Sequence, residues 1–144
     1  MAKAYVDGSY NVTTKRFGYG IVFFPCTNGP DDLTGELRLS KGFSNPELAE
    51  MRNVAGEIIG SGEAMKRARE MGIKELTIYH DYEGIAKWCT GEWKAKKTWT
   101  KKYKAFYDEV SKDVEISFVK VDAHTGDKYN EIADGLAKEA VGIE

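Results

Sequence analysis

The alternation of apolar and polar residues over positions 1–43 predicts three β-strands. Residues 3–11 and 17–24 are rich in aromatic and β-branched side chains, and the polar stretch NVTTK joins them. After the loop sequence PCTNGPDD, residues 33–43 predict a third strand. Strands that follow one another through such short connections are typical of an antiparallel meander.

The period of the pattern becomes helical after residue 45. Apolar residues recur every three or four positions over 46–71, which predicts one amphipathic helix beginning near Ser44-Asn45-Pro46. Five further elements follow. Residues 75–80 predict a short buried strand, and residues 82–91 predict a helix that ends at Gly91. A second helix is predicted at 99–112, another strand at 114–121 and a final helix at 128–140. This order, βββαβααβα, predicts a mixed α/β fold with a five-stranded sheet, in which antiparallel hairpins precede parallel strands added through helical crossovers.

Length and composition narrow the class of protein. A chain of 144 residues with a net charge of −2 fits one soluble domain spanning 1–144. No apolar run approaches the roughly 20 residues that span a bilayer, and the first residues lack the pattern of a signal peptide. Cys26 and Cys89 are isolated, as expected of reduced thiols. We therefore expect a cytoplasmic protein away from membranes, and a monomer without an obligate protein partner.

Positive charge is concentrated in one segment of this acidic chain. The sequence KAKKTWTKKYK, residues 94–104, holds six lysines together with Trp99 and Tyr103. Such a local patch is compatible with binding to phosphates even when the net charge is negative. A solvated lysine face with no ligand fits the same residues.

Two aspartates lie close to the predicted strands. Asp7 belongs to the first strand, and Asp81 directly follows the strand at 75–80. If these strands are parallel neighbours, the two acids come side by side, where repulsion usually implies a bound cation or a shared proton. Each acid also has a simpler reading, because Asp7-Gly8 is a common turn sequence and Asp81 could cap the next helix.

The remaining candidate residues lie on helices and in a loop. Periodicity puts Glu57 and Glu50 on one flank outside the apolar stripe, which predicts two solvated surface acids. His124 lies in a glycine-containing loop without a role that its sequence alone defines. In the last helix, Asp134 could be a surface acid paired with Lys138. The small or polar residues of that helix permit close packing; they are Asn130, Ala133, Ala137 and Ala140.

Four motifs together resemble the type 1 ribonuclease H family over almost the whole chain. They are YVDGS at Asp7, RNVAGE at Glu57, TIYHD at Asp81, and DAHTGDKYNEIADGLAKEA at His124 and Asp134. The last motif is the most specific, because a histidine loop followed by this helix rarely arises by chance. The closest likeness is to the branch often fused to an N-terminal hybrid-binding module.

The resemblance implies a fold, an activity and a set of metal ligands. The fold is a five-stranded mixed sheet with helices on both faces. The activity is endonucleolytic hydrolysis of the RNA strand of RNA–DNA hybrids, leaving 5′-phosphate and 3′-hydroxyl ends. Two Mg²⁺ ions, replaceable by Mn²⁺, would be held by Asp7, Glu57, Asp81 and Asp134. Glu57 is selected over Glu50 because it follows Asn53 by four residues, as in the family. His124 would move protons or help to release product.

The resemblance also implies contacts to nucleic acid. Ser9 and Asn53 match positions that contact the RNA backbone. The lysine-rich segment occupies the place of the family's basic protrusion, whose lysines would engage DNA phosphates and whose tryptophans would pack on sugars or on the core. The residues concerned are Trp93, Lys94, Lys96, Lys97, Trp99 and Lys101.

Three departures from the family pattern leave the affinity for the hybrid and the processivity open, and two other functions also fit the sequence. The glycine-rich turn after the first motif is replaced by YNVTTKR, the usual Asp-Ser pair reads Asp81-Tyr82, and the segment leading to the lysines is short. One alternative is a related metal-dependent DNA nuclease, such as a transposase or resolvase core. The other is a hybrid-binding module without catalytic activity.

Overall fold

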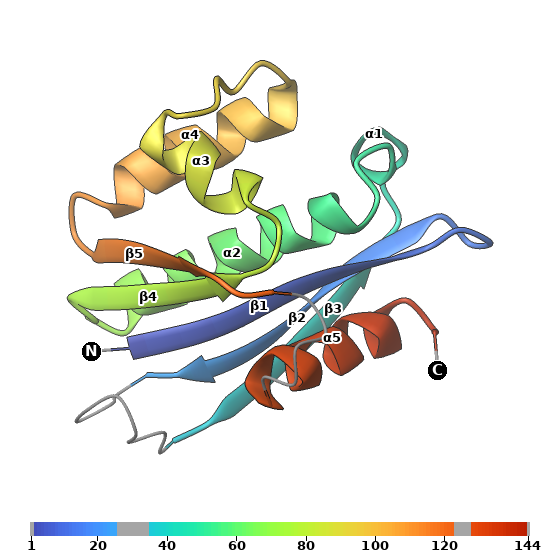
Figure 1. Cartoon of the computed structure of the whole chain (residues 1–144), viewed down its shortest axis with the longest axis horizontal. Coiled ribbons are helices and arrows are strands. Elements are labelled where there is room, and N and C mark those ends of the chain that lie inside the picture. The colour runs from blue at the N-terminus through green and yellow to red at the C-terminus, as the bar shows by residue number, and fades with distance from the viewer. Residues whose placement is uncertain (1, 26–34, 123–127, 144) are drawn as a thin grey trace.

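A five-stranded mixed sheet forms the centre of the molecule in the computed structural model, which describes residues 2–25, 35–122 and 128–143 (Figure 1). The strand order is β3-β2-β1-β4-β5. β1 pairs antiparallel with β2 and parallel with β4, as predicted from the element order. The strands are β1 (Ala2–Asn11), β2 (Arg16–Phe24), β3 (Leu37–Phe43), β4 (Glu75–His80) and β5 (Glu115–Lys120).

Helices cover both faces of the sheet, as expected. In Figure 1, α2, α3 and α4 lie above the sheet and α5 lies below it. None of the helices in the described ranges is both long and apolar enough to cross a membrane. The helices are α1 (Pro46–Ala49), α2 (Asn53–Glu70), α3 (Gly84–Thr90), α4 (Thr98–Val110) and α5 (Lys128–Ala140).

The prediction of one continuous helix over 46–71 is wrong. The chain leaves the helical conformation at Arg52, whose φ of 53° and ψ of −130° separate α1 from α2. The Asn45 side chain caps α1 at the predicted starting point by accepting hydrogen bonds from two backbone amides. The helix breaks although the apolar periodicity continues, because α1 packs Leu48 in a cluster with Phe17 while α2 runs in a different direction across the sheet.

Glycines let α2 rest directly on the backbone of the central strands. A Cβ atom on Gly8 of β1 would lie 2.0 Å from the Asn53 carbonyl oxygen. A Cβ atom on Gly56 of α2 would lie 1.8 Å from the Gly18 carbonyl oxygen. Because these distances leave no room for a side chain, the first turns of α2 contact β1 and β2 at glycine.

On the opposite face of the sheet, α5 also packs directly on the backbone at a glycine. A Cβ atom on Gly20 of β2 would lie 2.1 Å from the Ala133 carbonyl oxygen, and Ala133 and Ala137 are fully buried. The prediction that small residues allow α5 to pack closely is therefore confirmed. Gly20 pairs with Asp7 across the β1–β2 ladder, so this contact brings α5 near Asp7.

Candidate active site

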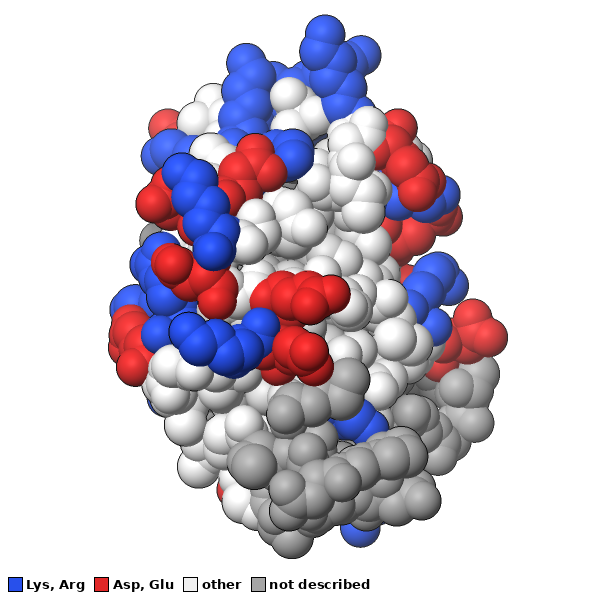
Figure 2. Space-filling model, turned by 90° about the vertical axis from the view of Figure 1, so that its left-hand side faces the viewer, with Lys and Arg blue, Asp and Glu red and all other residues white. Residues whose placement is uncertain are grey.

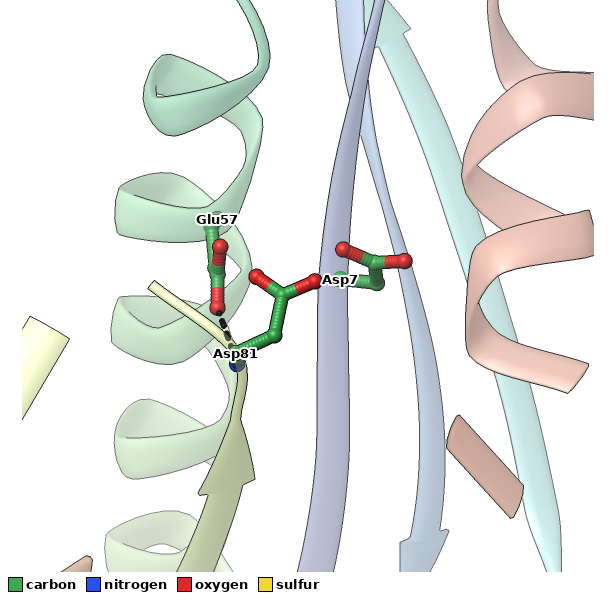
Figure 3. A group of neighbouring side chains, drawn as sticks. All are labelled: Asp7, Glu57 and Asp81. Carbon is green, nitrogen blue, oxygen red and sulfur yellow. Dashed lines mark hydrogen bonds between the residues drawn. The ribbon is translucent and has the colours of Figure 1, made fainter. Parts of the chain in front are cut away.

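Three carboxylates from distant parts of the chain meet beside the central strand β1, at the carboxyl end of β4. Asp7 comes from β1, Glu57 from α2 and Asp81 from the residue after β4, and one oxygen of each lies within 4.8 Å of the others (Figure 3). The parallel β1–β4 register pairs Tyr5 with Tyr79, so Asp7 and Asp81 follow at equivalent positions. The predicted meeting of these two aspartates is confirmed.

The simpler readings of Asp7 and Asp81 are wrong. Asp7 lies inside β1 opposite Gly20, and the chain turns only after Asn11. Asp81 does not cap α3, since that helix begins at Gly84 and has no side-chain cap.

Glu57 is buried, which contradicts the surface position predicted from periodicity. Its side chain is 1% exposed, because the close approach of α2 encloses it between helix and sheet. Glu57 Oε1 accepts hydrogen bonds from the backbone amides of Asp81 at 3.1 Å and Tyr82 at 3.4 Å. Glu57 Oε2 is buried and has no hydrogen-bond partner among the described residues. This carboxylate therefore fastens the chain after β4 with one oxygen and leaves the other for a ligand.

Burial and mutual repulsion favour protonated carboxyl groups in this cluster. Burial, followed by the nearby Asp81 and Asp134 carboxylates, raises the pKa of Asp7 to about 8, against the opposing hydrogen bond from the Gly8 amide. Burial, then the charges of Asp81 and Asp7, raises the pKa of Glu57 well above its ordinary value. A divalent cation would reverse this balance by favouring the ionised oxygens. The hard oxygen donors and the unpartnered Glu57 Oε2 fit such an ion.

Asp134 lies beside this group on α5 and makes the ion pair predicted for it. Its Oδ2 is 2.9 Å from Lys138 Nζ, with the Asp134 side chain 24% exposed. The same carboxylate is near enough to Asp7 to help raise the pKa of Asp7. Asp134 is therefore both ion-paired at the surface and adjacent to the three-carboxylate group. His124 lies outside the described residues.

The residues expected to contact nucleic acid differ in their surroundings. Asn53 is exposed at the first position of α2, whereas Ser9 is buried in β1. Trp93 packs edge-on against Tyr82 and Trp88, and Trp99 packs in the cluster formed around Leu48 and Phe17. Both tryptophans thus pack against the protein.

The lysines of the 94–104 segment lie at one end of the molecule. Lys94, Lys96, Lys97 and Lys101 are all exposed. Figure 2 shows lysine and arginine side chains at the top of the molecule, the end that α3 and α4 form in Figure 1, above a surface of mixed charge.

A groove of about 320 Å³ lies beside the lysine-rich segment. It reaches Tyr82, the neighbour of Asp81. Its lining residues are Met51, Val54, Tyr82, Trp88, Lys94, Lys96, Lys97 and Thr100. Sequence reasoning missed the aromatic wall of this groove, and the only available signal was the position of Tyr82 beside Asp81.

Comparison with known proteins decides the family. The profile of the family described as RNase H matches residues 2–142. The chain belongs to the RNase H family. Ribonuclease H proteins of Wolbachia pipientis wMel and of a Wolbachia strain from Drosophila simulans (wRi) are 40% identical to it over 62 residues. That stretch spans 41% of this chain and 43% of each Wolbachia protein.

Solved structures share the RNase H fold over nearly the whole chain. RNase H1 from Halobacterium salinarum NRC-1 has a TM-score of 0.74 at 22% identity, covering 97% of this chain and 96% of its own. The N-terminal RNase H domain of rv2228c from Mycobacterium tuberculosis gives 0.75 at 19%, with 98% and 94% covered. LC11-RNase H1, solved in complex with an RNA/DNA hybrid, gives 0.71 at 17%, with 98% and 99% covered. The expected ribonuclease H-like fold is therefore confirmed.

Proposed function

We propose that this chain is an endonuclease that hydrolyses the RNA strand of RNA–DNA hybrids, leaving 5′-phosphate and 3′-hydroxyl ends. Residues 1–144 would act as one catalytic domain. The observation that carries the proposal is the convergence of Asp7, Glu57 and Asp81 in an RNase H fold, with a buried Glu57 oxygen that has no partner in the part of the chain that the structure describes. Buried carboxylates repel one another, so a cluster of this kind is costly without a cation.

Four acidic residues would hold two divalent cations, Mg²⁺ or in its place Mn²⁺. Asp7, Glu57 and Asp81 already converge, and Asp134 lies beside Asp7. When bound, such cations supply the positive charge that activates an attacking water and stabilises a leaving oxygen. Glu57 also fixes the backbone that carries Asp81, and Lys138 restrains the Asp134 carboxylate.

The surface around the carboxylates suits a hybrid duplex. Exposed lysines at 94, 96, 97 and 101 would bind phosphates of the DNA strand, along the groove that leads to Tyr82. Asn53, exposed beside Gly8, would contact the RNA backbone, where a nuclease must sense 2′-hydroxyl groups. Ser9 would support this contact from β1, and His124 would transfer protons or aid product release. The complex of LC11-RNase H1 with an RNA/DNA hybrid supports this class of substrate.

Matched oligonucleotides test the proposal directly. The wild-type protein is incubated with one sequence prepared as RNA–DNA hybrid, duplex DNA and duplex RNA, in Mg²⁺, Mn²⁺ or EDTA. We expect cleavage of the hybrid's RNA strand only, with either cation and not in EDTA, and ligation and phosphatase assays should show 5′-phosphate and 3′-hydroxyl ends. Preferred cutting of duplex DNA would replace the proposal by the DNA-nuclease alternative. Binding of the hybrid without cleavage would replace it by the silent binding module.

A further inference from the structure

His80 is a buried histidine immediately before Asp81. It is the last residue of β4 and is 1% exposed. The ring packs edge-on against Phe118 of β5, with centroids 5.9 Å apart. The functional residues proposed from the sequence do not include it, although it directly precedes the predicted metal ligand Asp81.

One nitrogen of this ring holds the backbone of the next turn. His80 Nδ1 lies 2.9 Å from the carbonyl oxygen of Tyr82. A carbonyl oxygen only accepts hydrogen bonds, so Nδ1 must carry the proton and donate it. His80 Nε2 is buried and has no partner among the described residues, which is the arrangement of a neutral ring protonated at Nδ1.

The segment of Asp81 and Tyr82 is therefore fastened from two directions. Glu57 Oε1 accepts hydrogen bonds from both backbone amides, and His80 donates one to the Tyr82 carbonyl. The first contact comes from α2 and the second from β4, so the backbone on both sides of the Asp81 side chain is held. Metal ligands depend on groups that orient them in this way.

We propose that His80 is a positioning residue, whose hydrogen bond to the Tyr82 carbonyl fixes the turn that presents Asp81 to the cation site. The inference rests on the proposed function for the role of Asp81, and on geometry alone for the restraint of the turn. His80 does not contact the substrate or the cation in this scheme. Its contribution is to keep the Asp81 carboxylate pointed toward Asp7 and Glu57.

Three variants separate the hydrogen bond from the packing of the ring. His80→Leu fills the site without a donor, His80→Asn places an amide N–H near the position of Nδ1, and Phe118→Leu disturbs the same packing without removing the donor. Hydrogen exchange of the Asp81 and Tyr82 amides is followed by NMR in the metal-free protein. Half-saturating Mg²⁺ is measured from hybrid cleavage.

The predicted pattern is specific. His80→Leu should speed exchange of both amides by up to about tenfold, as expected for loss of one hydrogen bond, and should raise half-saturating Mg²⁺. His80→Asn should restore both quantities toward wild type, and Phe118→Leu should leave both near wild type. Equal effects of His80→Leu and Phe118→Leu, or no rescue by asparagine, would overturn the inference.

A measurement on the wild-type protein tests the inference without any variant that must fold. ¹⁵N NMR of the His80 ring should show a proton on Nδ1 and none on Nε2, and a proton on Nε2 alone would overturn the inference. If the wild-type protein failed to cleave hybrids, the proposed function would fall. The exchange rates and the ring tautomer would still decide whether His80 restrains the turn.

Discussion

At the scale of single residues, the site consists of acids that the sequence can locate but not fully place. The position of Asp81 after a buried strand was readable from the pattern, and the parallel register confirmed its meeting with Asp7. The burial of Glu57 could not be predicted from the sequence, because helical periodicity placed this residue on the solvated flank of the helix. Only the resemblance to the family separated Glu57 from Glu50, which is exposed at the end of α1.

The raised pKa of Asp7 gives the metal-free protein a defined dependence on pH. The folded pKa is about 8 and the ordinary value 3.8, so between these values the folded state binds more protons than the unfolded chain. The free energy of unfolding should therefore fall as the pH rises from about 4 to about 8. Thermal unfolding in EDTA measures it, and Asp7→Asn should show a weaker fall. A melting temperature that rises with pH over this range in EDTA would contradict the pKa assignment.

At the scale of elements, glycine contacts determine where the helices lie. Gly8, Gly18 and Gly56 let α2 touch the central strands, and this contact encloses Glu57. The sequence predicted most helices and strands, including α5 at its observed bounds. The break at Arg52 could not be predicted, because the helical spacing of apolar residues continues through residues 50–52. The break arises because α1 and α2 pack on the sheet with their axes in different directions.

Adding one methyl group at Gly56 should therefore destabilise the protein. The Cβ atom would lie 1.8 Å from a backbone oxygen of β2, so α2 must move away from the sheet. Gly56→Ala should lower the free energy of unfolding in urea by about 3 kcal/mol and should reduce cleavage by displacing Glu57.

Gly62 is the matched control on the same helix. Among the described residues, a Cβ atom there would contact the Phe106 ring alone, at 3.9 Å. Gly62→Ala should stabilise the protein by about 0.5–1 kcal/mol through helix propensity. If the two substitutions had equal effects, the close approach at Gly56 would not be what holds α2 in place.

The lysine-rich segment is the second element whose role can be measured separately. The triple variant Lys96→Ala, Lys97→Ala and Lys101→Ala should weaken hybrid binding and reduce the slope of log K against log salt by about 1–3. Three exposed lysines outside that segment provide a variant with the same change of charge: Lys66, Lys74 and Lys112. An equal loss of slope in both variants would assign the effect to net charge and not to this segment.

At the scale of the whole molecule, the order of elements predicted the architecture. Antiparallel strands followed by parallel crossovers gave the observed mixed sheet, and within the described ranges the order of elements departs from the prediction by the break that separates α1 from α2. The sheet brings residues 7, 57 and 81 together although they are far apart in the chain. The chemistry of this site cannot be predicted from topology alone, because it depends on burial and on the separation of individual oxygen atoms.

The most direct test of the central claim uses Asp81, the carboxylate that follows β4 and meets Asp7 and Glu57. Cleavage and binding of an RNA–DNA hybrid in Mg²⁺ are compared for wild type, Asp81→Asn and Glu50→Gln, the last being an exposed acid outside the cluster. Removal of a metal ligand should reduce cleavage by more than about 100-fold, with hybrid binding largely retained and Glu50→Gln close to wild type. An Asp81→Asn protein that cleaves the hybrid at the wild-type rate would contradict the account.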